Sequence, residues 1–161
     1  MDAWLAIASK REVRAYADTP IPDEIVNRIL DAGRLAGSSR NTQLWEFVVV
    51  ESAREELADA VYAPGNVLGA TLVVAIVGGA FGMDVGRCAQ NMMLAAWNDG
   101  VGSCPNGVAD AEAAARICGG EVKAILSFGY PEKPRDPQSR TVEEWSAKAN
   151  RKSLDELVRR V

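Results

Sequence analysis

Residues 83–98 read Met-Asp-Val-Gly-Arg-Cys-Ala-Gln-Asn-Met-Met-Leu-Ala-Ala-Trp-Asn, and the fold class depends on them more than on any other stretch. Their apolar residues are too many for a single helical stripe, so the stretch predicts a central helix that is buried on most of its sides. Asp99-Gly100 ends this helix, because glycine readily adopts the left-handed conformation of a helix cap. A helix of this kind is expected to have a sheet packed around it.

Four short apolar stretches on either side of this helix predict strands, since they are bounded by turn residues. These stretches are residues 45–50, 71–77, 101–104 and 122–128. Further helices are predicted at residues 4–8, 22–37, 51–61, 110–118 and 154–161, and residues 133–150 are expected to be loosely structured. Two helices precede the first strand, which favours an α+β layer over a doubly wound fold. No linker or repeat divides the 161 residues, so one domain spanning residues 1–161 is expected.

The composition limits the partners that the chain can have. Hydrophobic residues make up 48% and charged residues 25%, as in soluble globular proteins. The formal net charge of -4 argues against nucleic acid, which selects basic surfaces. The longest apolar run, Ala70–Ala80, is too short to span a bilayer, so no membrane partner is expected. A charged N-terminus unlike a signal peptide, together with three cysteines that form no C-x-x-C pair, predicts a cytoplasmic protein.

The chain contains no histidine. This absence excludes Ser-His and Cys-His catalysis, histidine zinc sites and histidine acid–base chemistry, and no metal site is expected. An enzyme with this composition is therefore expected to obtain its reactive group from a cofactor.

Three cations, Lys10, Arg11 and Arg14, lie within five residues beside Tyr16. One interpretation is an anion site, because a phosphate monoester carries nearly two negative charges and favours guanidinium groups. The alternative is a solvated helix end whose cations face the carbonyl dipole. The residues alone leave both interpretations open.

Three further stretches are polar or glycine-rich. Residues 38–43, Ser-Ser-Arg-Asn-Thr-Gln, offer hydroxyl and amide groups to a ligand, or form an ordinary hydrogen-bonded loop. Residues 100–107 match neither a dinucleotide fingerprint nor a P-loop, although their glycines would let the backbone approach a flat ligand. Asn150-Arg151-Lys152 precedes the last predicted helix, where a surface charge pair is the simpler interpretation.

Taken together and in this order, these motifs resemble those of the nitroreductase family of flavoenzymes. Residues 9–16 read Ser-Lys-Arg-Glu-Val-Arg-Ala-Tyr, similar to the family's Ser-Arg-Arg-Ser-Val-Arg-x-Phe. Residues 36–45 read Ala-Gly-Ser-Ser-Arg-Asn-Thr-Gln-Leu-Trp, similar to its Ala-Pro-Ser-Ser-x-Asn-x-Gln-Pro-Trp. The helix from Asp84 to Gly102, the stretch Ser127–Pro131 and the tail from Asn150 to Glu156 extend the resemblance over almost the whole chain.

The resemblance implies a fold, a cofactor and a site. The implied fold is a dimeric three-layer α+β structure, with a mostly antiparallel sheet around a buried helix and helices on both sides. The implied cofactor is FMN at the interface of a homodimer. Lys10, Arg11 and Arg151 would hold the FMN phosphate, and Arg14 would lie near the N1 and O2 edge of the ring. The partner subunit would contribute Ser38, Ser39 and Asn41, while Asn106 and Gly107 would bring backbone close to N5.

The implied activity is ping-pong transfer of hydride from NADH or NADPH to a small acceptor such as a nitroaromatic or a quinone, with no catalytic side chain. Glu12 stands where the family usually has Ser, Gly37 and Leu44 replace two prolines, and the chain is short for the family. These departures leave two alternatives open. One is a flavin-binding protein without efficient turnover, and the other is a branch that fragments or dehalogenates its ligand or uses a deazaflavin.

Overall fold

The computed structural model describes all 161 residues. The chain divides into two units by its internal contacts. The core unit is Arg11–Arg135, and the terminal unit joins Met1–Lys10 to Asp136–Val161. The expectation of a single domain over residues 1–161 therefore stays a prediction.

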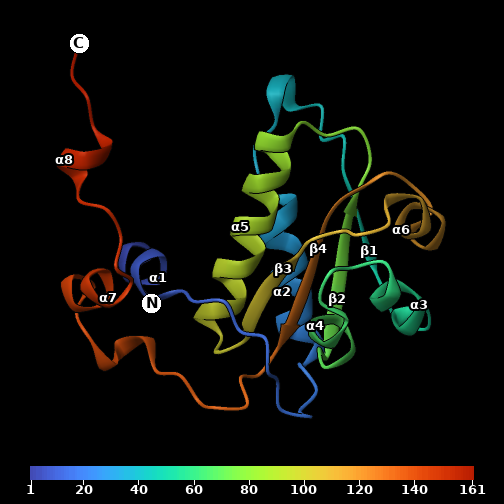
Figure 1. The fold of residues 1–161 in the computed structure, drawn as a ribbon, viewed down its shortest axis with the longest axis horizontal. Coiled ribbons are helices and arrows are strands. Elements are labelled where there is room, and N and C mark those ends of the chain that lie inside the picture. Colours follow the sequence, from blue (N-terminus) through green and yellow to red (C-terminus); the bar gives the residue numbers. More distant parts are fainter. The chain divides into compact units, whose positions relative to one another are not determined.

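The core unit contains one sheet of four strands, and all of its pairings are antiparallel (Figure 1). The strand order is β1-β2-β4-β3, with bounds Glu46–Val49, Leu72–Val77, Val122–Gly129 and Gly102–Asn106. All four predicted strands are confirmed. The third extends to Asn106, because Pro105 and Asn106 continue the register opposite Leu126 and Ile125.

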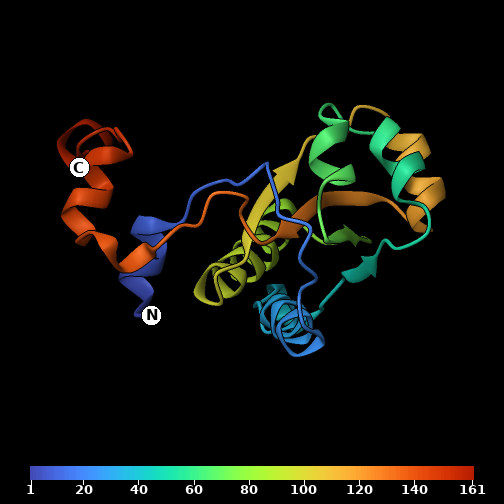
Figure 2. The same ribbon diagram turned by 90° about the horizontal axis from the view of Figure 1, so that it is seen from below.

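Helices cover both faces of this sheet (Figure 2). They are α2 (Asp23–Arg34), α3 (Arg54–Asp59), α4 (Pro64–Leu68), α5 (Gly82–Asn98) and α6 (Ala111–Cys118). Because successive side chains of a strand point to opposite faces, Val74 and Ile76 join an apolar cluster with α2 and α5, while Val73 and Ala75 join another with α3, α4 and α6. The predicted α+β class is confirmed by this arrangement, and α4 is a helix that the sequence patterns did not predict.

The long helix α5 differs from its prediction. Eight of its residues are buried, and it packs closely on α2, where a Cβ added to Gly33 would lie 2.9 Å from the Met92 side chain. Met83, Gly86, Arg87 and Gln90 are nevertheless exposed, so within one chain the helix is covered on one side only. The exposed residues recur at helical spacing and form a face of their own. None of the helices is both long and apolar enough to cross a membrane.

The terminal unit packs α1 (Ala3–Ser9) against α7 (Val142–Lys148), and it also contains a 3₁₀ turn at Pro137–Ser139 and the short α8 (Leu154–Leu157). Asp2 caps α1, accepting a hydrogen bond from the Trp4 N–H at 2.8 Å.

Two predictions fail in the terminal unit. Residues 133–150 are not loosely structured, because Thr141 and Glu144 form a capping box and Trp145 gives α7 a buried side chain. The predicted tail helix ends early, at Leu157, after a second capping box formed by Ser153 and Glu156.

Candidate functional site

The segment Arg11–Tyr16, here called the cation segment, runs along the open edge of β3. Val13 donates its N–H to the Ser103 carbonyl at 3.0 Å, and Glu12 forms a parallel bridge with the same residue. Val13 is buried over Gly102, where an added Cβ would lie only 2.6 Å from the Val13 side chain. Since side chains alternate along extended backbone, Glu12 and Arg14 point away from Val13, and both are exposed.

Arg14 lines a groove of about 370 Å³ between this segment and the chain that follows β4. The charged residues of the groove are Glu12, Arg14, Glu132, Lys133 and Arg135. Cations therefore outnumber acids by three to two, which suits an anion only where Glu12 and Glu132 do not face it.

Tyr16 ties the cation segment to the neighbouring strand β4. Its hydroxyl lies 2.6 Å from the Val13 carbonyl and 3.0 Å from the Ser127 hydroxyl, while its ring covers Gly129. Burial raises the pKa of Tyr16 to about 12, so the hydroxyl keeps its proton at neutral pH.

Asn106 extends these hydrogen bonds to the end of β3. Its amide Nδ2 donates to the Cys104 carbonyl at 3.2 Å, to the Ile125 carbonyl at 3.4 Å and to the Ser127 hydroxyl at 3.2 Å. The side-chain oxygen Oδ1 is buried without a hydrogen-bond partner, although Asn106 is only 9% exposed. Buried polar atoms are rarely left unpaired, so this residue marks a specialised position.

The turn that follows Asn106 is fixed to the segment between α3 and α4. The carbonyl of Gly107 accepts a hydrogen bond from the Tyr62 N–H at 3.0 Å, and the Ala109 N–H donates to the Ala60 carbonyl at 2.8 Å. A Cβ at Gly107 would lie 3.0 Å from the Tyr62 ring. The exposed backbone of Gly107 is therefore held in place by these contacts.

Ser38, Ser39 and Asn41 lie in a separate loop, at the N-terminal end of α5 (Figure 1). The Ser39 N–H points to the Asp84 carboxylate at 3.4 Å, and the Ser38 hydroxyl accepts from the Gln43 N–H at 3.0 Å. Arg40, Asn41 and Gln43 adopt positive φ angles of 53°, 57° and 50°. Such left-handed conformations are costly for residues other than glycine and cluster at functional sites.

The core unit thus brings Arg11, Arg14, Asn106 and Gly107 to one strand, β3. The loop Gly37–Gln43, here called the serine loop, lies apart from the first two of these residues. Gly102, on which Val13 packs, follows the C-terminal end of α5, whereas the loop packs on the first turn of α5. A helix of 17 residues is about 25 Å long, so Val13 and the loop lie near opposite ends of α5.

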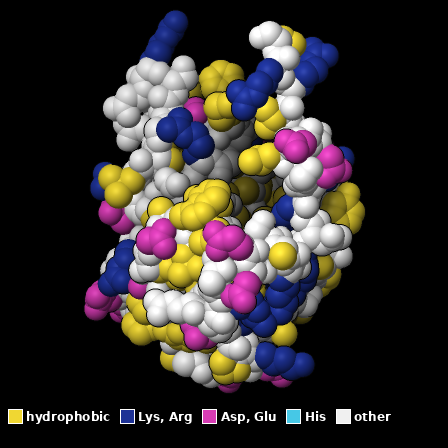
Figure 3. All heavy atoms as spheres, turned by 90° about the vertical axis from the view of Figure 1, so that its left-hand side faces the viewer, with side chains coloured by type: hydrophobic (Ala, Val, Ile, Leu, Met, Phe, Trp, Pro, Cys, Tyr) yellow, Lys and Arg dark blue, Asp and Glu magenta, His cyan; other side chains and the backbone are white.

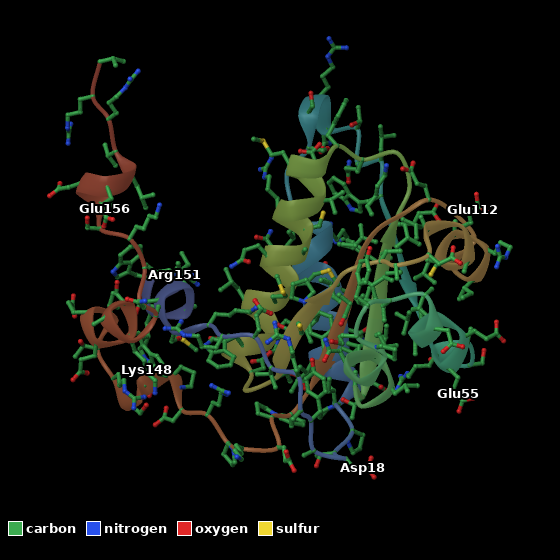
Figure 4. The ribbon with its side chains drawn as sticks, viewed as in Figure 1. Asp18, Glu55, Glu112, Lys148, Arg151 and Glu156 are labelled. Carbon is green, nitrogen blue, oxygen red and sulfur yellow. The ribbon has the colours of Figure 1, made fainter.

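Lys10 and Arg151 belong to the terminal unit, and their roles stay predictions. Arg151 is exposed in the link between α7 and α8 (Figure 4). On the face drawn in Figure 3, Lys and Arg side chains are interspersed with those of Asp and Glu.

Ser127 is a residue that sequence reasoning missed. The signal was available, because a hydroxyl stands between Leu126 and Phe128 in a strand that is otherwise apolar at its centre. Alternation along β4 places Ser127 on the same face as Ile125, opposite Cys104. The two other free cysteines, Cys88 and Cys118, have raised thiol pKa values because they are buried, which keeps them protonated and unreactive.

Comparison with known proteins decides the family. The model of the nitroreductase family matches residues 7–77 and 80–130, which is most of the chain. The chain belongs to the nitroreductase family. A protein from Archaeoglobus fulgidus, provisionally named an NADH dehydrogenase/NAD(P)H nitroreductase, is 31% identical to this family member over 150 residues, covering 81% of this chain and 86% of its own length.

Two further comparisons agree. A protein of the same provisional name from Methanothermobacter thermautotrophicus is 30% identical over 118 residues, and the match covers 67% of this nitroreductase-family chain and 62% of the relative. The chain thus matches less than two thirds of that relative's length. A structure from Desulfovibrio desulfuricans, provisionally named a nitroreductase and solved in complex with FMN, superposes with a TM-score of 0.81. The superposition covers 98% of this chain and 96% of the other chain. Because the two sequences are only 24% identical, the match supports the fold alone.

Proposed function

We propose that this member of the nitroreductase family binds FMN, accepts hydride from NADH or NADPH and passes it to a small acceptor such as a nitroaromatic or a quinone. Family membership supports an NAD(P)H-dependent flavin oxidoreductase, and a related fold has been solved with FMN. The observation that carries the proposal is the cation segment, which is held along β3 at Ser103, the strand that leads into the fixed Asn106–Gly107 turn.

The residues of the core unit fit the two chemical parts of FMN. The phosphate needs guanidinium or ammonium groups, and Arg11 would supply one from the core unit, while phosphate contacts by Lys10 and Arg151 stay predictions. The planar ring needs a surface that backbone can approach closely, and Gly107 offers one. Bound FMN would supply the hydride-accepting atom N5, so no side chain has to act as acid or base.

In this proposal different parts of the protein would contact the two regions of the flavin ring. Arg14, exposed on the edge of β3, would face N1 and O2, where reduction leaves negative charge that a fixed guanidinium stabilises. The Asn106–Gly107 backbone would border N5. Reductant and acceptor would use the same open side in turn, as a ping-pong reaction requires.

A homodimer is part of the proposal, because one chain keeps the serine loop apart from the β3 residues. Ser38, Ser39 and Asn41 would then reach the ring of the partner subunit. Apolar side chains are exposed around the N-terminal end of α5, where a second copy would cover them. They are Leu35, Leu44, Phe81 and Met83. The partner would also cover the open face of α5, giving the buried central helix and the three layers expected from the sequence.

One observation favours a second candidate, a flavin-binding protein without efficient turnover. Glu12 is exposed in the same groove as Arg14, on the same side of the cation segment. A carboxylate there opposes both the phosphate and the negative charge of reduced FMN. Such a site would bind FMN and yet accept hydride poorly.

The test has two stages. The protein freed of flavin is first titrated with FMN, followed by absorbance and fluorescence, with Arg14→Ala as the variant and Arg116→Ala on α6 as the matched exposed control. FMN is expected to bind to the wild type and to the control, and weakly to Arg14→Ala. The FMN complex is then mixed with NADH or NADPH without oxygen. Bleaching supports the oxidoreductase, persistent yellow colour supports the second candidate, and a protein that ignores FMN refutes both.

A further inference from the structure

A buried chain of hydrogen bonds links the two parts of the proposed flavin site. Asn106 Nδ2 donates to the Ser127 hydroxyl at 3.2 Å, which lies 3.0 Å from the Tyr16 hydroxyl, which in turn donates to the Val13 carbonyl at 2.6 Å. Each of the two hydroxyls can accept one hydrogen bond and donate one along this path. The Ser127 hydroxyl has the Cys104 carbonyl at 3.2 Å as a second acceptor. When its proton is donated to Tyr16 instead, the chain has one direction, from the end of β3 to the residue beside Arg14.

The surroundings of this chain allow little adjustment. Ser127 is fully buried, and Asn106 is 9% exposed. Nδ2 of Asn106 also faces the Cys104 and Ile125 carbonyls, so its two hydrogens are shared among three acceptors. The reversed carboxamide would turn Oδ1 toward these carbonyls, so the carboxamide has one orientation, which leaves Oδ1 buried and unpaired.

We propose that Tyr16 and Ser127 are positioning residues, which couple the Arg14 end of the flavin site to the Asn106–Gly107 end. This inference rests on the proposed function. Neither hydroxyl needs to touch the cofactor. Tyr16 holds the carbonyl that precedes Arg14, and Ser127 holds the side chain that precedes Gly107, so a displacement at either end is transmitted through three hydrogen bonds. Networks of this kind act as a unit in a low-dielectric interior.

The chain offers matched controls for both hydroxyls. Ser127→Ala and Tyr16→Phe each remove one link. Ser103→Ala removes an equally buried hydroxyl that has no hydrogen-bond partner and lies on the neighbouring strand. Tyr130→Phe removes a tyrosine hydroxyl outside the network. Tyr16→Phe retains the ring over Gly129, so it tests the proposal even where Ser127→Ala fails to fold.

The first measurement is the dissociation constant of FMN, together with the visible absorption band of the bound flavin. Ser127→Ala and Tyr16→Phe are expected to weaken FMN binding about fivefold and to shift the band, while both controls match the wild type. Circular dichroism and thermal unfolding of the flavin-free variants establish that each is folded. Equal FMN affinity and an unchanged band in Ser127→Ala and Tyr16→Phe would overturn the proposal.

The second measurement separates coupling from a merely structural role. Arg14→Ala is made in the wild type and in Ser127→Ala, and its effect on FMN binding is compared. If the two ends are coupled, Arg14→Ala costs less affinity for FMN in the Ser127→Ala background than in the wild type. The two fold-losses are expected to differ by a factor of about three or more. Effects that simply multiply refute the coupling while leaving the proposed function intact. Failure of the wild type to bind FMN refutes the proposed function itself.

Discussion

The β3 edge and the serine loop reach their positions by different physical means. The β3 edge, Arg11–Tyr16 with Asn106 and Gly107, is held by buried, long-range hydrogen bonds to β3 and β4. The serine loop, Gly37–Gln43, is exposed and relies mainly on short-range bonds such as that from the Gln43 N–H to Ser38. Its backbone is also strained, with three residues at positive φ.

This difference shows two routes to a prearranged ligand site. Buried networks fix side chains by making every alternative costly, because a displaced polar group would lose its partners. A strained backbone conformation in an exposed loop persists only where surrounding contacts stabilise it. A bound ligand or a second subunit can provide some of these contacts. Changes at the buried positions of the β3 edge should therefore affect folding as well as binding, whereas loss of an exposed side chain that would contact the ligand should affect mainly binding.

The largest expected effect is that of Gly102→Val. The new Cβ would lie 2.6 Å from the Val13 side chain, so the cation segment has to move off β3. We expect the free energy of unfolding to fall by about 3 kcal/mol and FMN retention to be lost, measured by urea unfolding and flavin titration. Gly79→Val is the control, since a Cβ there meets nothing within 4 Å. Similar behaviour of the two variants would contradict the packing of Val13 on Gly102.

Arg14→Ala comes next. It is expected to weaken FMN binding by about 10- to 100-fold, as removal of a charge-assisted hydrogen bond does. The temperature of unfolding should hardly change, because Arg14 is exposed. Isothermal titration with FMN gives the affinity, and Arg14→Lys should show an intermediate loss, since an ammonium lacks the planar fork. If Arg14→Ala binds FMN with the affinity of the wild type, Arg14 is not part of the FMN site.

Gln43→Gly tests the strain in the serine loop. Glycine adopts the φ angle of 50° without steric cost, so the flavin-free protein should gain about 0.5–1 kcal/mol in the free energy of unfolding. FMN binding should weaken slightly as the loop loosens. Thr42→Gly is the matched control, because Thr42 has a φ of -72° and glycine there should only destabilise. A loss of stability in Gln43→Gly equal to that in Thr42→Gly would mean that the loop holds no strain.

The smallest effect concerns pH. Burial raises the pKa of Tyr16 from an ordinary 10 to about 12, so its neutral form contributes stability in full below pH 10 and loses it as the pH rises toward 12. Near pH 11 the Tm of the wild type should fall relative to Tyr16→Phe by about 2 °C, after allowance for partial exposure to solvent. Parallel pH profiles of the two proteins would show that Tyr16 is not buried as described.

Much of the fold could be predicted from local patterns. The strands and the longer helices follow from apolar runs and helical spacing, and Asp2 and Gly100 mark helix ends through their capping chemistry. The short α4 escaped prediction because five residues show no periodicity. The helix α7 escaped because its sequence is polar apart from Val142, Trp145 and one alanine, although its capping box was visible.

The candidate site was less accessible to sequence reasoning. The cation segment and the Asn106–Gly107 turn stood out by charge and glycine content, but their proximity depends on the bridge between Glu12 and Ser103, a long-range contact. The role of Ser127 in joining Tyr16 to Asn106 required the register of β3 against β4. Positive φ at Arg40 and Gln43 could not be anticipated, because neither residue type favours it.

The packing of α1 against α7 has a consequence for how the protein is made. α1 precedes the core unit in the chain and α7 follows it, so during synthesis α1 leaves the ribosome before its partner has been made. The core unit, Arg11–Arg135, has its own internal contacts and can assemble in the meantime. α1 is therefore made before the core unit and packed on α7 after it, and its Trp4 and Ile7 stay exposed during that interval.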